Sequence, residues 1–104
     1  MRTPSHPRPQ ELELPNVLHA LSDPVRLEIV RALDGGSELA CSCLGPPVSK
    51  STLSHHLKVL RESGITSTRA EGTQRLVSLR TEDLEACFPG LLGCVLSGLD
   101  RQAV

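Results

Sequence analysis

The stretch that most constrains this chain runs from Val48 to Gly64, because both ends of a helix are encoded in it. Ser49 is a good N-cap, since its hydroxyl oxygen can accept hydrogen bonds from free backbone N–H groups of the first turn. Gly64 suits the left-handed conformation that ends many helices. The span between them is about 14 residues, near the usual helix length. The stretch therefore predicts one amphipathic helix.

This helix is expected to have two different faces. At about 100° per residue, Leu53, Leu57 and Leu60 form one narrow apolar stripe. The opposite face is small, polar and basic, and it consists of Ser51, Ser54, His55 and Lys58. Such a face is typical of a solvated surface helix, and it is also typical of a recognition helix that reads base edges in the major groove.

The residues after the helix favour the recognition helix. Residues 65–70 are rich in β-branched side chains, residues 71–73 supply a turn, and residues 74–80 form a second extended run. This pattern predicts a β-hairpin with Arg69, Gln74 and Arg75 near its tip. A hairpin directly after such a helix is the arrangement of a winged helix-turn-helix, in which the wing adds contacts beside the groove.

Three segments carry a specific resemblance: Leu21–Val30, which contains Asp-Pro-Val-Arg, then Ser49–Ile65, and then Glu71–Arg75. They resemble the ArsR/SmtB family of bacterial transcriptional regulators, and the likeness extends over residues 14–100. The resemblance implies a mainly α fold with a small β-hairpin, a winged helix-turn-helix that dimerises through its terminal helices. It also implies a repressor of transcription whose DNA binding is weakened by an inducer.

The expected partner is a double-stranded DNA operator with two-fold symmetry, bound by a homodimer. In the recognition helix the candidate DNA-binding residues are Ser49, Lys50, Ser51, Thr52, Ser54, His55, Lys58 and Arg61. In the wing they are Arg69, Thr73, Gln74 and Arg75. We expect Ser51, Ser54, His55 and Lys58 to read or approach bases. The residues expected to position phosphates and the wing are Ser49, Lys50, Arg61, Thr73 and Arg75.

The charge distribution agrees with this interpretation although the net charge is only −1. Residues 49–80 hold six lysines and arginines against two acids, whereas residues 81–104 hold one arginine against four acids. The positive charge is therefore concentrated on the helix and the hairpin, as a DNA-binding face requires. A dimer would double the positive charge of this face.

A length of 104 residues allows one small domain, which we place at residues 11–104. Residues 1–10 contain Pro4, Pro7 and Pro9 and are expected to be a disordered arm. A helix should begin at Leu14, and a second should run from the Asp23 cap to about Leu33. Residues 37–44 are expected to be a short helix, the first of the helix-turn-helix pair.

The C-terminal region is expected to contain two helices, one capped by Thr81 and one spanning residues 90–102. The last helix has a broad apolar stripe and two glycines, so it should depend on packing for its stability. This stripe either folds back on the core or, as the resemblance implies, joins two subunits. The candidate dimer residues are Leu14, Val17, Leu18, Leu91, Leu92, Val95, Leu96 and Leu99.

Four cysteines leave three interpretations open: packing, redox sensing, or a metal or metalloid site. Cys41 and Cys43 resemble the Cys-X-Cys pair of some metalloregulators in the family, displaced by one residue. Two thiolates underfill a tetrahedral zinc site, and no local third ligand is evident. Cys87 and Cys94 are seven residues apart, about 10 Å along an unbroken helix, which is too far for an easy intrahelical disulfide. No metal or cofactor is therefore assigned.

Other classes of function find less support in the sequence. No catalytic triad, phosphate loop or paired carboxylates occur at an interpretable spacing, so an enzyme is not expected. No apolar run approaches a membrane span or the core of a signal peptide, so a cytoplasmic protein without membrane contact is expected. A winged-helix module that binds proteins rather than DNA remains the alternative from a different class.

Overall fold

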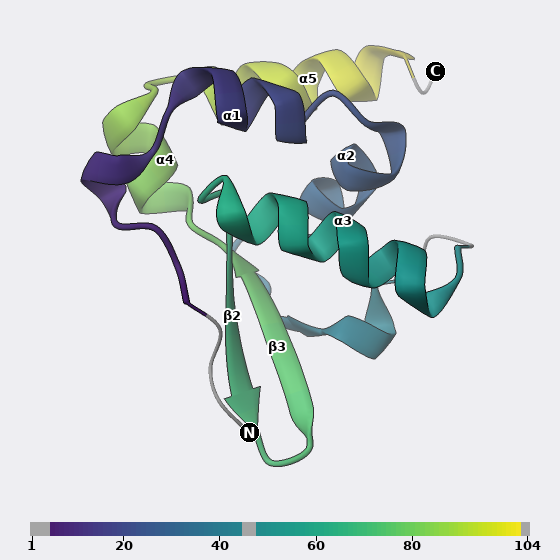
Figure 1. Cartoon of the computed structure of the whole chain (residues 1–104). Coiled ribbons are helices and arrows are strands. Elements are labelled where there is room, and N and C mark those ends of the chain that lie inside the picture. The colour runs from purple at the N-terminus through teal and green to yellow at the C-terminus, as the bar shows by residue number, and fades with distance from the viewer. Residues whose placement is uncertain (1–4, 45–47, 103–104) are drawn as a thin grey trace.

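The structure is a computed structural model, and it describes residues 5–44 and 48–102. The helices are α1 (Leu14–Ala20), α2 (Pro24–Leu33), α3 (Lys50–Glu62), α4 (Thr81–Cys87) and α5 (Leu91–Gln102), with 3₁₀ turns η1 (Pro9–Glu11) and η2 (Cys41–Cys43). The strands are β1 (Leu39–Ala40), β2 (Thr66–Glu71) and β3 (Gln74–Leu79). In Figure 1 the β2–β3 hairpin projects away from the helices, while α1 and α5 both lie at the opposite end of the molecule.

The predicted helix at the centre of the chain is confirmed as α3. The Ser49 hydroxyl accepts a hydrogen bond from the backbone N–H of Thr52 at 3.2 Å. After the helix, Gly64 adopts φ +89°, the left-handed conformation that the sequence predicted. A Cβ atom at Gly64 would also meet the end of the Leu12 side chain, which would have to shift to make room. Both ends of α3 are therefore determined locally.

The predicted hairpin is also confirmed. Strands β2 and β3 pair antiparallel from Thr66 opposite Leu79 to Glu71 opposite Gln74. Gly72 lies in the connecting turn at φ +61°, a conformation that glycine adopts without strain. The sheet order is β1-β3-β2, so β2 is an edge strand of the hairpin that forms the wing.

The expected helix at residues 37–44 is wrong. Leu39 and Ala40 instead form β1 and pair with Val77 and Leu76 of β3, and the 3₁₀ turn η2 follows. A helix of this length would have few internal hydrogen bonds, and its nucleation is costly. Pairing with the second edge of β3 satisfies the backbone of this short segment instead.

The hydrophobic core contains two residues that were predicted to lie at a dimer interface. Val17 is 1% exposed and Leu92 is 8% exposed, so both pack inside one chain, although they were expected at a dimer interface. They belong to a cluster whose other most deeply buried large apolar members are Ile29, Val30, Leu33, Leu60, Ile65 and Val77. The cluster joins α1, α2, α3, the sheet and α5, and it provides the support beneath α3.

The expected cap at Thr81 is displaced by one residue. Thr81 is the first residue of α4, and Arg80 occupies the N-cap position without a side-chain cap. Arg80 donates its backbone N–H to Ile65 O at 3.0 Å, and its guanidinium Nε lies 3.1 Å from Asp83 Oδ2. This arginine therefore links the start of α4 to the residue just before β2.

The N-terminal segment differs from the expected disordered arm. Residues 1–4 lie outside the described residues, but residues 5–12 pack on the protein. The backbone N–H of Thr68 on β2 donates to His6 Nε2 at 2.9 Å. Arg80 Nη1 donates to Pro7 O at 2.7 Å, and η1 follows. We call residues 5–12 the strap, because they cover part of the exposed edge of β2 in the wing (Figure 1).

The strap is predicted to loosen in acid. Burial, together with the positive charges of Arg80 and Arg61, lowers the pKa of His6. The folded state then binds fewer protons than the unfolded state, so the stability contributed by His6 is present above about pH 6.5 and is lost as the pH falls. Protonation also removes the Nε2 lone pair that Thr68 uses. Amide exchange should therefore show a lower protection factor at Thr68 near pH 5.5 than near pH 7.5.

The variant His6→Ala should lose this pH dependence. His55→Ala is the matched control, because His55 is an exposed histidine on α3. A Thr68 amide whose protection is equal at both pH values in the unaltered protein would contradict the role of His6.

Candidate nucleic-acid interface

The outward face of α3 is fully accessible, as expected for a recognition helix. The exposed side chains on it are those of Ser49, Lys50, Ser51, Thr52, Ser54, His55 and Lys58, while Arg61 near its end is partly buried. Ser49 Oγ also lies 2.9 Å from Thr52 Oγ1 and 3.2 Å from Ser51 Oγ, so the hydroxyl groups at the N-terminus form one network. The face therefore presents short hydrogen-bonding groups and positive charge to solvent.

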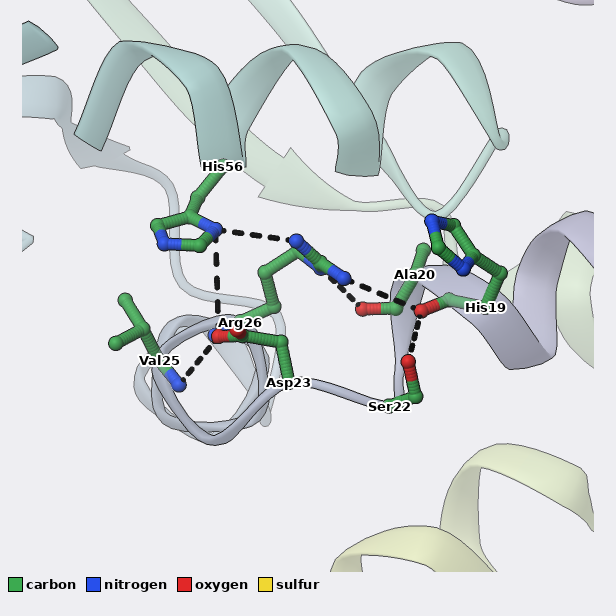
Figure 2. Close-up of polar contacts among 7 residues, drawn as sticks. All are labelled: His19, Ala20, Ser22, Asp23, Val25, Arg26 and His56. Atoms are coloured by element: carbon green, nitrogen blue, oxygen red, sulfur yellow. Dashed lines mark hydrogen bonds and ion pairs between the residues drawn. The ribbon is translucent and has the colours of Figure 1, made fainter. Parts of the chain in front are cut away.

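The inward face of α3 is held by a buried arginine from α2, shown in Figure 2. Arg26 is 7% exposed, and its Nη1 lies 3.2 Å from Nδ1 of His56, which is 8% exposed. The same guanidinium donates from Nε to Ala20 O at 2.6 Å and from Nη2 to His19 O at 3.2 Å. Arg26 therefore connects the end of α1, its own helix α2 and the recognition helix.

The cluster also contains the Asp23 carboxylate, and the Arg26 guanidinium supplies hydrogen-bond donors only. The Asp23 carboxylate caps α2 by accepting from Val25 N at 2.8 Å and Arg26 N at 3.2 Å. Its Oδ1 also lies 4.0 Å from His56 Nδ1. The positive charge of Arg26 is also favourable at the end of α1, because the last carbonyl groups of a helix carry partial negative charge.

The wing residues differ in their contacts within the protein. Thr73, Gln74 and Arg75 are exposed at the tip, as expected. Arg69 is engaged differently: it forms a bidentate pair with Glu38, 2.8 Å from each carboxylate oxygen, and it lies 2.9 Å from Glu71. Its hydrogen bond lowers the pKa of Glu38, and the pair raises the pKa of Arg69. Arg69 therefore joins the wing to the segment before β1, a structural role that the sequence interpretation did not include.

A groove separates α3 from the wing. Its volume is about 530 Å³, and its described walls come from β1 with η2, from α3, and from both strands and the turn of the hairpin. Lys50, Arg61 and Arg75 line it, together with Leu53 and Leu57 from the inner side of α3. The groove lies on the same side of the molecule as the candidate DNA-binding residues.

The cysteines are not gathered into one centre. Cys41 is partly buried and lines the groove, whereas Cys43 is exposed. Burial raises the pKa of the Cys41 thiol, which disfavours the thiolate that metals and oxidants need. Cys87 donates to Pro9 O at 3.4 Å, and Cys94 is exposed on α5. In residues 5–44 and 48–102, no group of three or more His, Cys, Asp or Glu side chains is arranged to hold a metal ion.

Sequence reasoning missed Arg26 as part of this interface, although a signal was present. Arg26 precedes Ile29, Val30 and Leu33 at helical spacing, so it occupies the buried stripe of α2. His56 likewise falls among Leu53, Leu57 and Leu60 in α3, and it is buried. A polar residue on the apolar stripe of each helix is the pattern that would have indicated a buried polar contact.

An exposed polar helix face beside a two-stranded wing, supported by a helical core, defines a winged helix-turn-helix DNA-binding protein. A family described as "Helix-turn-helix domain" matches residues 21–69.

Two curated proteins and one solved structure illustrate the relationship. The chain is 42% identical over 79 residues to the uncharacterized transcriptional regulator YceK of Bacillus subtilis, covering 73% of this chain and 79% of that one. It is 40% identical over 74 residues to an arsenical resistance operon repressor of Staphylococcus xylosus, covering 70% and 71%. A homodimeric winged helix-turn-helix domain from Mycobacterium bovis, described as a possible ArsR-family regulator, is 25% identical, with a TM-score of 0.68 and coverages of 86% and 81%. These similarities show that the chain belongs to the ArsR family of transcriptional regulators and that it is a DNA-binding regulator.

Replacing Arg26 should destabilise the protein strongly. Arg26→Met leaves His56 Nδ1 and the carbonyl groups of His19 and Ala20 without their buried donor. We expect a loss of about 2–4 kcal/mol in the free energy of unfolding, measured by urea denaturation, because each unsatisfied buried group costs about 1–3 kcal/mol. Arg26→Lys should recover only part of this loss, since an ammonium group lacks the planar fork.

The matched control is Arg31→Met on the same helix. Arg31 Nη2 lies 2.7 Å from Asp100 Oδ1, in a pair whose side chains are 35% and 67% exposed. Its loss should cost less than about 1 kcal/mol. Equal losses for the two arginine variants would contradict the special role of Arg26.

Proposed function

We propose that the protein is a homodimeric repressor that binds a two-fold symmetric operator, with one α3 in each major-groove half-site. The observation that carries the proposal is the two-sided character of α3. Its inner side is fixed to α1 and α2 through His56 and Arg26, while its outer side exposes small polar and basic side chains. A helix that reads bases needs both a rigid base and an accessible face.

Within this proposal the residues have distinct roles. Ser51, Ser54, His55 and Lys58 approach base edges, because they occupy the exposed face of α3. Ser49, Lys50, Thr52 and Arg61 on α3, and Thr73, Gln74 and Arg75 on the wing, position the protein on phosphates. Arg69 is omitted from the DNA-contacting set, because its charge is already paired with Glu38 and Glu71.

The proposed dimer interface involves α1 and α5. Leu14 and Leu18 on α1 are 43% and 47% exposed, the large apolar side chains most exposed in the described ranges. Leu91, Val95, Leu96 and Leu99 on α5 are only partly buried. Both helices lie at the end of the molecule away from the wing tip, so pairing there leaves α3 and the wing accessible (Figure 1). The solved Mycobacterium bovis relative is described as homodimeric, which supports this arrangement.

Repression is proposed from the Staphylococcus xylosus relative, whose name is arsenical resistance operon repressor. We propose that the protein acts in the cytoplasm, where operator DNA is accessible. Within residues 5–44 and 48–102, no helix combines the length and hydropathy of a membrane span. No metal or cofactor is included in the proposed mechanism, and the raised pKa of Cys41 favours a packing role for that thiol.

Besides approaching the base edges, the Lys58 ammonium group should make an ionic contact with a flanking phosphate. Lys58→Ala should weaken binding and lower the slope of log affinity against log salt by about 0.9 for each protomer that loses a phosphate contact. The measurement is fluorescence anisotropy with a labelled operator fragment, obtained by enrichment from source-genome DNA at two salt concentrations. Arg101→Ala on α5 is the matched control, since it removes the same charge at an exposed position outside α3 and the wing. Equal slopes for Lys58→Ala and the unaltered protein would remove Lys58 from the phosphate contacts.

The dimer proposal makes a separate prediction. The double variant Leu14→Lys, Leu18→Lys places charge on the exposed apolar face of α1, so it should shift the protein from dimer to monomer while far-UV circular dichroism is retained. Sedimentation velocity measures the change, and operator affinity should fall by more than about tenfold because only one half-site remains. Asn16→Lys adds charge at another exposed position of α1 and should leave the dimer intact. A double variant that sediments as a dimer would contradict an interface at α1.

A further inference from the structure

The groove between α3 and the wing combines two properties that DNA binding alone does not require. Its inner surface is apolar, formed largely by Leu53 and Leu57 of α3 with Ala40 of β1. Its rim is cationic, because Lys50, Arg61 and Arg75 all line it. Among the described residues that line it there is no aspartate or glutamate. Neutral polar side chains complete the described lining, those of Ser42, Ser54, Thr68, Thr73 and Gln74. Leu57 is buried whereas Lys50 and Arg75 are exposed, so the groove combines an inner apolar patch with positive charge at its opening.

The Cys41 thiol belongs to the apolar part of this groove. Burial raises the pKa of the thiol despite the nearby positive charges of Arg75 and Arg61. A neutral thiol behaves as a small apolar group, so it extends the surface formed by Leu53 and Leu57. Cys43, by contrast, is exposed and is not among the described residues that line the groove.

The volume of the groove is suited to a small molecule. About 530 Å³ lies within the range of roughly 300–1,000 Å³ that is typical of ligand sites in proteins, which are mostly apolar with a few polar anchors. A DNA phosphate can use the cationic rim, but it has no apolar part to cover Leu53 and Leu57. An organic anion with an apolar body satisfies both parts of the groove at once.

We propose that this groove binds a small organic anion, a single carboxylate or sulfonate on an apolar body, and that this ligand is the signal that releases DNA. The acidic group lies at the rim near Lys50, Arg61 and Arg75, and the apolar body lies on Leu53, Leu57 and Cys41. The ligand then occupies the space between the recognition helix and the wing, and it competes for cations that phosphates would use. The regulatory part rests on the proposed repressor function, whereas the binding part rests on the groove alone.

The binding part is tested with 8-anilinonaphthalene-1-sulfonate, an anion with an aromatic body whose emission rises in apolar sites. The chain contains no tryptophan and no tyrosine, so protein emission does not interfere. The full-length reduced protein should increase the probe's emission saturably at neutral pH. Octanoate should displace the probe at concentrations at least about tenfold lower than octanol or octyltrimethylammonium, because only octanoate pairs with the cationic rim. Equal displacement by all three compounds would overturn the proposed preference for an anion.

Two cysteine variants locate the site. Cys41→Phe fills the groove and should weaken probe binding by at least about tenfold, since the apolar body loses its space. Cys43→Phe is the matched control, because Cys43 lies in the same 3₁₀ turn but is exposed and does not line the groove. Arg61→Gln removes one rim charge without filling the groove, so it should weaken octanoate more than octanol even if Cys41→Phe folds poorly. Probe binding unchanged in both Cys41→Phe and Arg61→Gln would overturn the assignment, and would place the probe on another apolar surface such as Leu14 and Leu18.

The regulatory part is tested separately by anisotropy with the operator fragment. Octanoate should release the fragment from the unaltered protein and should do so poorly from Cys41→Phe. Operator binding without any saturable anion binding would overturn the groove proposal and leave the repressor proposal intact. Anion binding at the groove without operator binding would overturn the repressor proposal and leave the binding part of the groove proposal intact. Anion binding that leaves operator affinity unchanged would overturn the signalling role alone.

Discussion

The orientation of the recognition helix depends on one buried guanidinium group. Arg26 donates to the last carbonyl groups of α1 and contacts His56 of α3, while its own helix is capped by Asp23. A planar fork with fixed donor directions can join three helices in one geometry, which apolar contacts alone do not specify. The apolar cluster around Leu60 and Val30 supplies stability, and the arginine determines how α3 is presented.

The wing is held by contacts from outside the hairpin. Arg69 pairs with Glu38 before β1, His6 accepts from Thr68 at the edge strand, and β1 covers the other side of β3. A two-stranded hairpin alone is only marginally stable in water, so these contacts make its position relative to α3 well defined. A groove of definite shape between helix and wing is a consequence of this support.

Local signals in the sequence predicted the central elements well. The Ser49 cap, the Gly64 stop, the Asp23 cap and the turn at Gly72 each act within a few residues, so helix and hairpin boundaries were readable. The segment 37–44 was misread, because its conformation is decided by pairing with β3, far along the chain. The sequence could not fully separate residues of a dimer interface from residues of the core. Val17 and Leu18 are neighbours on one helix, and only their burial in the structure distinguishes them.

The sequence by itself determined the amphipathic recognition helix, the wing and the concentration of positive charge on both, because periodicity, caps and turn residues are local properties. Only the tertiary structure decided which polar residues serve the scaffold and which face solvent. Arginine and histidine are polar residue types that usually lie at the protein surface. The long-range packing of the chain nevertheless gives Arg26, His56 and Arg69 each a fixed partner. The groove has the same origin, because its walls come from α3, the wing and the η2 turn, which meet only when the chain folds.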